Sequence, residues 1–362
     1  MLSRPSPQHM THERAYYVKI RLYFLLAAGL LGFAPTFASA QALGDSKVVA
    51  TVPGAGFPEG IAVRGNRFYV SGPAVIGAPL GSAYVHAYDS RTGTREATFP
   101  ITISNPAAGI SAAACAAFGP DGKLYVIEPF VGVVRMDLDR NNSQSVYAAF
   151  TPSGPSLLND LAFDDEGNLY VTDSFAATIY RIPAGGGTPT VWFADPRLVG
   201  DPAFPFGVNG IRVDKNSKHI YVSVTVQAGN LDGVIYRLPL VPNPTAADLQ
   251  EFHRYPFIPR NLATGPDGIA FGKSGKLYVA LAGTSQISVL RPNGTEQARY
   301  SGPAANPAGS PNEMPWANPA NIAFGTNSES LLVTNHASFV PFDPALFVVF
   351  DVFVDDKEQP LP

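Results

Sequence analysis

Side chains able to bind a hard metal ion occur at one position of a pattern that repeats six times along the chain. Each copy contains a short apolar strand, and the position of interest lies two residues before the leading apolar residue of that strand. Four of the six copies place a side-chain oxygen donor there, and two of these donors are carboxylates. In chain order the six residues are Glu59, Ala114, Asn159, Asn209, Asp267 and Ala320.

Two carboxylates and two carboxamides that face one another predict a site for a divalent cation. Without a cation, the carboxylate charges would repel each other and be poorly solvated. Ca²⁺ takes about 6–8 oxygen ligands, and water or substrate supplies those that the protein lacks. The set contains no sulfur or imidazole, which argues against zinc or copper. The alternative is that the four residues only begin strands, because Asp and Asn are common in turns.

The strands that would position these residues follow one another in a fixed order. Within each copy, a tight turn joins the first apolar strand to a second one that ends in Tyr-Val or a similar pair, as at 124–126. Third and fourth strands are visible too, for example at 178–182 and 190–193. Successive copies begin 45 to 58 residues apart. This spacing fits one four-stranded propeller blade per copy, and no window shows the 3.6-residue periodicity of helical repeats.

The two ends of the repeat array predict how the ring closes. An open ring of six blades would leave two bare sheet edges. The last copy ends with a third strand at 345–354, and residues 47–52, before the first copy, can supply its missing outer strand. We therefore predict an all-β fold, a six-bladed β-propeller over residues 41–362 closed by pairing an N-terminal strand with the last blade. In such a ring, residues that precede the inner strands meet at one mouth of the channel.

The first 40 residues have the pattern of an export signal. Four basic side chains and one acidic side chain precede an apolar run at 22–37, which ends at Ala38-Ser39-Ala40. This arrangement predicts a signal peptide at 1–40, cleavage near Gln41, and a secreted or periplasmic protein without membrane attachment after cleavage. The alternatives are retention of the segment as a membrane anchor and a true start at Met10.

The composition excludes some classes of protein. The chain has 362 residues, of which 46% are hydrophobic and 15% charged, so it is neither a disordered tail nor a coiled coil. Its net charge is −4, and it has no basic stripe. Nucleic acid is therefore a poor partner, and we expect the partner to be a small molecule.

The motifs that head four inner strands resemble those of a known family. These motifs are Pro58-Glu59-Gly60, Asn159-Asp160, Asn209-Gly210 and Pro266-Asp267-Gly268. They are similar to those of the gluconolactonase, senescence marker protein and luciferin-regenerating enzyme family, and more distantly to the paraoxonases. The resemblance covers essentially the whole chain after the leader. It implies that Glu59, Asn159, Asn209 and Asp267 hold a catalytic Ca²⁺, or another divalent ion such as Mg²⁺, Mn²⁺ or Zn²⁺.

The resemblance also implies an activity, the opening of lactones and some esters. The metal would polarise the carbonyl group while a carboxylate activates water, and Asp267 is the favoured base. Sugar-lactone members of the family carry an Arg two residues before the matched Asn, where this chain has Leu157. With the apolar, Pro-rich connections at 196–207 and 302–319, this difference favours a substrate with an apolar acyl or aryl portion. Both connections could instead be plain solvent-facing loops.

Further residues are expected near the channel mouth. Asp160 would orient Asn159 or serve only in a turn. Turns after the second strands would bring Glu128, Asp173 and His336 close to the opening, with His336 as a possible second base. Trp316, in the 302–319 connection, would contribute to the apolar wall.

Two other functions stay open at the level of sequence. One is a non-catalytic propeller that binds a ligand or protein and keeps Ca²⁺ as an axial brace, since propellers often act as scaffolds. The other is a carbon–oxygen lyase or a condensing enzyme, as in the strictosidine synthase relatives. The set of four oxygen ligands favours the hydrolase and the binding propeller over this third function.

Overall fold

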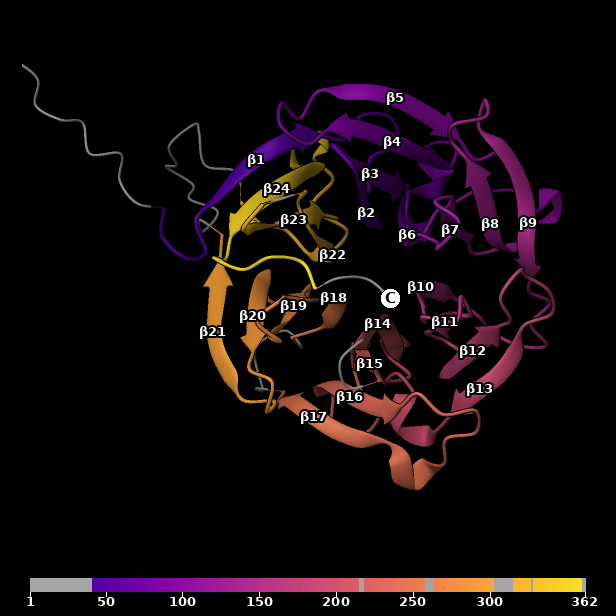
Figure 1. Cartoon of the computed structure of the whole chain (residues 1–362), viewed down its shortest axis with the longest axis vertical. Coiled ribbons are helices and arrows are strands. Elements are labelled where there is room, and N and C mark those ends of the chain that lie inside the picture. The colour runs from indigo at the N-terminus through magenta and orange to yellow at the C-terminus, as the bar shows by residue number, and fades with distance from the viewer. Residues whose placement is uncertain (1–40, 215–217, 258–263, 303–314, 327, 360–362) are drawn as a thin grey trace, which may run out of the picture. The chain divides into compact units, whose positions relative to one another are not determined.

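Six β-sheets lie around a common axis in the computed structural model, which describes residues 41–214, 218–257, 264–302, 315–326 and 328–359 (Figure 1). Each sheet has four antiparallel strands, and five of the sheets are built from consecutive strands. In the sixth sheet, β1 (Ser46–Thr51) pairs with β24 (Val348–Phe353) as the outer strand. The fold is the predicted six-bladed β-propeller with the predicted closure. The predicted leader, 1–40, lies outside the described residues.

The blades use equivalent strands in equivalent places. The innermost strands are β2 (Ile61–Arg64), β6 (Ala116–Phe118), β10 (Leu158–Phe163), β14 (Val208–Asp214), β18 (Pro266–Phe271) and β22 (Pro319–Phe324). The second strands are β3 (Arg67–Gly72), β7 (Leu124–Glu128), β11 (Leu169–Asp173), β15 (His219–Val224), β19 (Leu277–Leu281) and β23 (Ser330–Asn335).

The third and fourth strands complete each sheet toward the rim. The third strands are β4 (Tyr84–Asp89), β8 (Gly132–Asp137), β12 (Thr178–Ile182), β16 (Gly233–Pro239), β20 (Gln286–Leu290) and β24. The outer strands are β5 (Arg95–Pro100), β9 (Ser143–Ala149), β13 (Thr190–Ala194), β17 (Gln250–Tyr255), β21 (Glu296–Ser301) and β1. The described connections contain five 3₁₀ turns, η1 (Val75–Leu80), η2 (Pro106–Ala108), η3 (Pro196–Leu198), η4 (Ala246–Asp248) and η5 (Pro344–Leu346).

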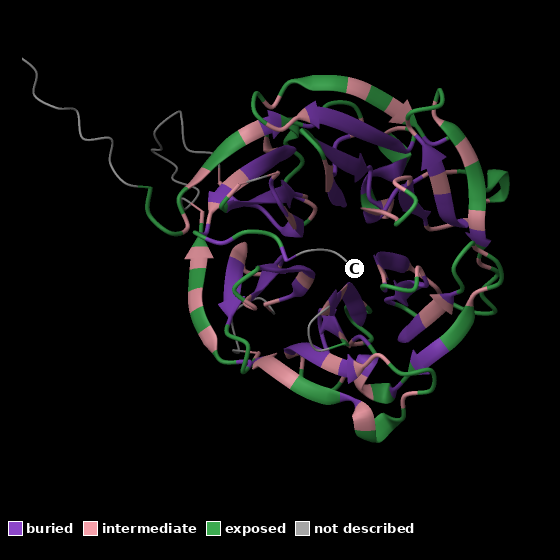
Figure 2. Cartoon of the chain, viewed as in Figure 1, coloured by how far each residue is buried: buried purple, intermediate pink, exposed green. Residues whose placement is uncertain are grey.

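The hydrophobic cores lie between neighbouring blades. The second strand β19 is buried along its whole length, whereas the outer strand β21 of the same blade has no buried residue (Figure 2). The Tyr of the recurring Tyr-Val pair packs edge-on against a Phe of the next blade's inner strand. Tyr125 contacts Phe163 in this way with ring centroids 4.9 Å apart, and Tyr221 contacts Phe271 at the same distance. In four of the six blades, the repeated motif thus joins a sheet to its neighbour.

The last blade differs in one detail from the prediction. The expected third strand at 345–354 begins as η5, and only β24 is extended. Asp343 caps the 3₁₀ turn by accepting a hydrogen bond from the backbone N–H of Ala345, and Pro344 occupies its first position. These two residues favour a helical turn over a strand.

The described C-terminal tail crosses toward the axis at the end of the channel opposite the ring of oxygen donors (Figure 1). Glu358 pairs with Gly272, which follows β18, whereas the donors precede or begin the inner strands. Asp356 accepts a hydrogen bond from the Tyr278 hydroxyl.

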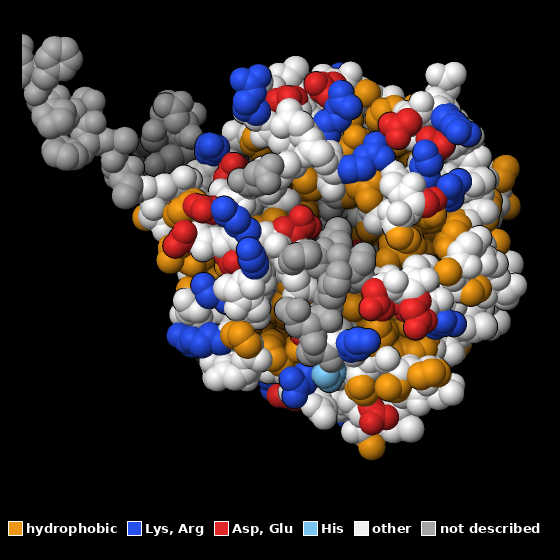
Figure 3. All heavy atoms as spheres, in the orientation of Figure 1, with side chains coloured by type: hydrophobic (Ala, Val, Ile, Leu, Met, Phe, Trp, Pro, Cys, Tyr) orange, Lys and Arg blue, Asp and Glu red, His pale blue; other side chains and the backbone are white. Residues whose placement is uncertain are grey.

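On the face in this view, acidic and basic side chains are interspersed (Figure 3). Within the described residues, no helix has the length and apolar character needed to cross a membrane.

Candidate metal centre

Backbone irregularities in the inner strands accompany three of the four oxygen donors, Asn159, Asn209 and Asp267. In four blades, the register of the inner strand shifts around the donor position and the residue after it, as between Leu158 and Leu161 in β10 and between Val208 and Ile211 in β14. Such a bulge turns side chains out of the regular alternation of a strand. These four blades can therefore present the side chain at the donor position to the channel while the rest of the strand packs between sheets, whereas Glu59 lies before its inner strand, which pairs without a register shift.

The structure brings the four predicted ligands together. Glu59, Asn159, Asn209 and Asp267 all line one cavity of about 680 Å³ at the channel mouth. Ala114, which occupies the donor position of the second blade, lines the same cavity. The donors come from four different blades and are separated by up to 208 residues of sequence. Ring closure is therefore what places them in one site.

Two oxygen atoms of this quartet lack a hydrogen-bond partner. Glu59 and Asn159 are each 7% exposed and Asn209 is 3% exposed. The Oδ1 atoms of Asn159 and Asn209 are buried without a hydrogen bond. Asn209 Nδ2 donates to Thr225 Oγ1 at 2.9 Å, which fixes the orientation of that amide. Buried carbonyl oxygens without a donor are unfavourable, and a bound cation would satisfy them.

The two carboxylates of the quartet are difficult to ionise in the protein alone. Burial, and secondarily the nearby charge of Asp160, raises the pKa of Glu59 to about 8. Burial, followed by the charges of Glu59 and Asp160, raises the pKa of Asp267 well above its usual range, while a hydrogen bond from Asn209 acts in the opposite direction. A divalent cation would remove this penalty, since it stabilises the ionised forms of both groups.

The donor set therefore fits a hard cation. It provides two carboxylates and two carboxamides, which suit Ca²⁺ or a similar ion, and leaves positions for water or substrate. Within the described part of the chain, no three His, Cys, Asp or Glu side chains form a metal-binding group. Any cation held here thus depends on the Asn oxygens as well as on the carboxylates.

His336 reaches the same cavity from the sixth blade. Its Nε2 atom lies 3.5 Å from Glu59 Oε2 and has no hydrogen bond. Burial lowers the pKa of His336 to about 4, so the imidazole is neutral near pH 7 and the contact is not an ion pair. A neutral imidazole next to the quartet can accept a proton.

Asp160 belongs to the channel below the quartet. Its carboxylate accepts hydrogen bonds from Ile211 N at 3.1 Å and from Arg212 Nη1 at 2.7 Å. Arg212 Nη2 also donates to Asn321 Oδ1 of the sixth blade at 3.3 Å, so this side chain reaches across the axis. The predicted role of Asp160 in orienting Asn159 stays a prediction. Sequence reasoning missed Arg212, although the equivalent residue in every other copy is alanine (Ala62, Ala117, Ala162, Ala270 and Ala323).

Besides Asp160, three of the expected mouth residues do not line the cavity. Glu128 and Asp173 end second strands and cap loops of their own blades, accepting hydrogen bonds from Phe130 N at 2.9 Å and Leu157 N at 2.8 Å. Trp316 is buried in the core formed with strands of the last two blades. The sequence places these residues at the correct end of a blade, but local hydrogen bonding and packing direct their side chains away from the cavity.

The cavity wall above the quartet is apolar. Its larger side chains include Leu157, Leu158, Phe175, Phe204, Phe206 and Phe339. Phe204 connects two loops, because its ring lies 5.1 Å from that of Phe206 and 5.4 Å from that of Phe339, centroid to centroid. The connection at 196–207 thus contributes wall residues, as the sequence indicated. Of the 302–319 connection, residues 303–314 lie outside the described chain.

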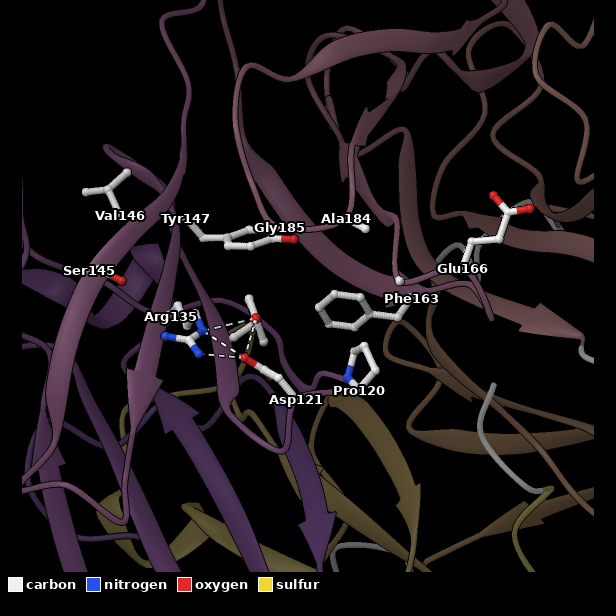
Figure 4. A pocket seen from close by; sticks show the side chains of 12 residues that line it. Pro120, Asp121, Arg135, Ser145, Val146, Tyr147, Phe163, Glu166, Ala184 and Gly185 are labelled. Atoms are coloured by element: carbon white, nitrogen blue, oxygen red, sulfur yellow. Dashed lines mark hydrogen bonds and ion pairs between the residues drawn. The ribbon is translucent and has the colours of Figure 1, made fainter.

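A second hollow, of about 440 Å³, lies near the rim between the second and third blades (Figure 4). Tyr147, Phe163 and Glu166 surround it together with the pair Arg135 and Asp121. Arg135 Nη2 lies 2.7 Å from Asp121 Oδ2, so these two charges satisfy each other. The hollow lacks the unpaired, buried oxygen atoms that distinguish the axial cavity.

Comparison with known proteins places the chain in a family. The family model described as the SMP-30/gluconolactonase/LRE-like region matches residues 81–337. Diisopropyl-fluorophosphatase of Loligo vulgaris is 24% identical over 303 residues, which cover 80% of this chain and 88% of that protein. Regucalcin from Agrobacterium tumefaciens, a calcium-binding protein, shares the fold with a TM-score of 0.64 at 18% identity, over 88% of this chain and 96% of its own.

A gluconolactonase from Xanthomonas campestris shares the fold as well. Its TM-score is 0.55 at 14% identity, over 89% of this chain and 99% of its own. The family match spans all blades except parts of the first and last. The chain therefore belongs to the SMP-30/gluconolactonase/LRE-like family, a family of hydrolase-type propellers that includes gluconolactonase and diisopropyl-fluorophosphatase.

Proposed function

We propose that the protein is an exported, calcium-dependent hydrolase that opens a lactone or ester with an apolar portion. The observation that carries this proposal is the axial quartet, in which two carboxamide oxygens are buried without hydrogen bonds beside two carboxyl groups with raised pKa values. Such a set is poorly balanced without a cation. Family membership supports hydrolysis as the reaction.

The mechanism assigns separate tasks to the residues of the cavity. Glu59, Asn159, Asn209 and Asp267 would hold the cation, which when bound supplies Lewis acidity to the carbonyl oxygen of the substrate. Asp267 accepts the proton of the attacking water at its carboxylate, which the cation would keep ionised and therefore able to act as a base. The proton then passes to the leaving alkoxide, which gives the alcohol and the carboxylic acid. His336, neutral and close to Glu59, is the alternative proton acceptor.

The wall of the cavity supports a neutral, partly apolar substrate. Large apolar side chains outnumber the polar ones around the quartet. The cavity is also lined by three carboxyl groups, Glu59, Asp201 and Asp267, and no described Lys or Arg side chain lines it. Apart from the proposed cation, the cavity therefore offers no basic side chain that could anchor an anionic substrate. A hydroxylated sugar acid would find few polar anchors, so an alkyl or aryl lactone or ester is the better fit.

A substrate panel with matched variants tests the proposal. We expect hydrolysis of alkyl lactones, aryl esters or diisopropyl fluorophosphate with Ca²⁺ and its loss with chelator. Asp267→Asn should lower kcat/KM by about 100-fold or more, the effect of removing a general base. Asp201→Asn is the control, because it removes a carboxylate from the same cavity outside the quartet, and it should retain activity within a few-fold. Full activity in Asp267→Asn would show that the proposed base is wrong.

The same panel decides between the hydrolase and a binding propeller. If no substrate turns over while Ca²⁺ still raises the melting temperature, the cation serves as an axial brace and the hydrolase proposal fails.

The proposed export depends on residues 1–40, which lie outside the described structure. N-terminal sequencing of protein from the periplasm or culture medium should give a chain that begins near Gln41.

A further inference from the structure

A buried hydroxyl group recurs in the second strands, next to the inner strands that surround the axis (Figure 1). It directly follows the Tyr-Val pair, or the equivalent pair, in four of the six blades, and all four side chains are fully buried. The residues are Ser71, Thr172, Ser223 and Thr334. The other two blades have Ile127 and Ala280 at this place, which carry no hydroxyl.

Each hydroxyl donates a hydrogen bond to the next blade, and the acceptor is always the backbone carbonyl of the residue at the donor position. The distances are 2.6 Å from Ser71 Oγ to Ala114 O, 2.6 Å from Thr172 Oγ1 to Asn209 O, 2.7 Å from Ser223 Oγ to Asp267 O and 2.9 Å from Thr334 Oγ1 to Glu59 O. Three of the four acceptors thus belong to the quartet.

These three hydroxyls also accept a hydrogen bond from their own blade. Thr172 accepts from Asp160 N at 3.1 Å, Ser223 from Gly210 N at 2.8 Å and Thr334 from Asn321 N at 2.9 Å. Each hydroxyl therefore joins two neighbouring inner strands at the level of the quartet. The remaining ligand, Asn159, is held differently, because its carbonyl accepts from the backbone N–H of Cys115 at 3.1 Å.

We propose that Thr172, Ser223 and Thr334 are positioning residues for the cation-binding quartet, an inference that rests on the proposed function. Ligands from separate blades must keep their mutual geometry to a fraction of an ångström, and no chain segment connects them directly. Each hydrogen bond fixes the peptide group attached to the Cα of a ligand, so it limits how that ligand moves relative to the preceding blade. Partners behind the ligands commonly affect metal affinity by about 10–100-fold.

Ser71 provides a matched control within the same chain. It makes the same kind of buried hydrogen bond to the next blade, but the residue whose carbonyl it holds is Ala114, which cannot bind a cation. If the hydroxyls serve only to hold blades together, loss of any of them should have similar consequences. If they position ligands, loss of Ser71 should affect only the stability of the fold.

The experiment measures Ca²⁺ affinity and metal-free stability for Thr172→Val, Ser223→Ala, Thr334→Val and Ser71→Ala. Isothermal titration with Ca²⁺ follows removal of metal by chelator, and thermal denaturation is recorded in chelator. We expect all four variants to melt at lower temperature than the unaltered protein. Thr172→Val, Ser223→Ala and Thr334→Val should each bind Ca²⁺ at least about tenfold more weakly than the unaltered protein. The Ca²⁺ affinity of Ser71→Ala should stay within about twofold of that of the unaltered protein. Thr172→Ser and Ser223→Thr, which keep the hydroxyl group, should also bind Ca²⁺ about as tightly as the unaltered protein.

Two results would overturn the inference alone: Ca²⁺ affinity unchanged in the three variants, or weakened as much in Ser71→Ala. If Ser223→Ala does not fold, Ser223→Cys and Ser71→Cys form a second pair, because a thiol of similar size is a weaker donor. Absence of Ca²⁺ binding by the unaltered protein would instead overturn the proposed function itself, together with this inference.

Discussion

At the scale of single residues, the site is defined by an imbalance between buried oxygen atoms and the groups available to satisfy them. Burial raises the pKa of both Glu59 and Asp267, the charge of Asp160 adds to both shifts, and the charge of Glu59 adds to that of Asp267. Arg212 compensates Asp160 through a direct contact at 2.7 Å. The charge of the two upper carboxylates therefore has no described cationic side chain as its partner, which is the physical reason to expect a bound cation.

This imbalance predicts how stability depends on pH. In chelator, the free energy of unfolding should fall by about 1 kcal/mol as pH rises from 7 to 8. In the unfolded chain Glu59 ionises near its ordinary pKa of 4.5, whereas in the folded chain its pKa is about 8. Raising the pH through this range therefore favours the unfolded chain, in which Glu59 loses its proton more readily. Asp267 acts in the same direction. Burial lowers the pKa of His336 from 6.5 to about 4, which makes the free energy of unfolding rise with pH instead. Most of this rise occurs below pH 7, so it changes the expected fall between pH 7 and 8 only slightly.

Urea denaturation at pH 7 and pH 8, with chelator and with Ca²⁺, measures this dependence. Saturating Ca²⁺ should abolish the fall, because the cation favours the ionised carboxylates, and Glu59→Gln should reduce the fall in chelator. Stability that rises or stays constant between these pH values in chelator would contradict the electrostatic account.

For single residues, the sequence predicts the place in the fold better than the direction in which the side chain points. The oxygen donors could be found because their position repeats, and a repeat of known geometry brings equivalent positions together. Glu128 and Asp173 lie at equivalent ends of their strands, but capping bonds to nearby backbone N–H groups direct their carboxylates into their own blades. His336 is one residue further along its strand end and reaches the cavity. A shift of one residue at the end of a second strand decides whether the side chain reaches the cavity, and the sequence alone does not show which residue will do so.

At the scale of elements, the loop between η3 and β14 decides what the cavity can hold. Phe204 is 36% exposed and bridges to Phe339 of the loop after β23, so it forms an edge of the cavity.

The hydroxyl positions on the second strands show a different limit of sequence reasoning. Ser71, Thr172, Ser223 and Thr334 repeat as regularly as the oxygen donors, but the pattern gains meaning only when the acceptor on the next blade is known.

Substitution of Phe204 should change substrate preference. Phe204→Ser should raise KM for alkyl or aryl substrates about tenfold, because loss of a contacting aromatic surface removes roughly 1–2 kcal/mol of apolar burial. A small, unsubstituted lactone should be affected by less than about twofold. Phe342→Ser is the control, since Phe342 is more exposed, at 61%, and does not line the cavity. Equal effects of Phe204→Ser on large and small substrates would argue against an apolar binding wall.

At the scale of the whole molecule, ring closure converts a linear repeat into a site. β1 pairs with β24 over Ser46–Thr51, so the first and sixth blades are held in place and Glu59 of the first blade faces ligands of the third to fifth. The closure could be predicted because the last copy lacked one strand and a spare strand preceded the first. Arg212 could not be assigned in the same way, because its partners Asp160 and Asn321 lie on other blades and meet it only across the axis.

Direct titration of the purified mature protein with Ca²⁺, after removal of metal, shows whether the axial quartet binds a cation. The account predicts binding of one ion per chain at the axis, with Glu59→Gln and Asp267→Asn each weakening it by at least about 100-fold while Asp201→Asn binds as the unaltered protein does. Absence of binding by the unaltered protein, or undiminished binding by both quartet variants, would contradict the claim that these residues hold one cation.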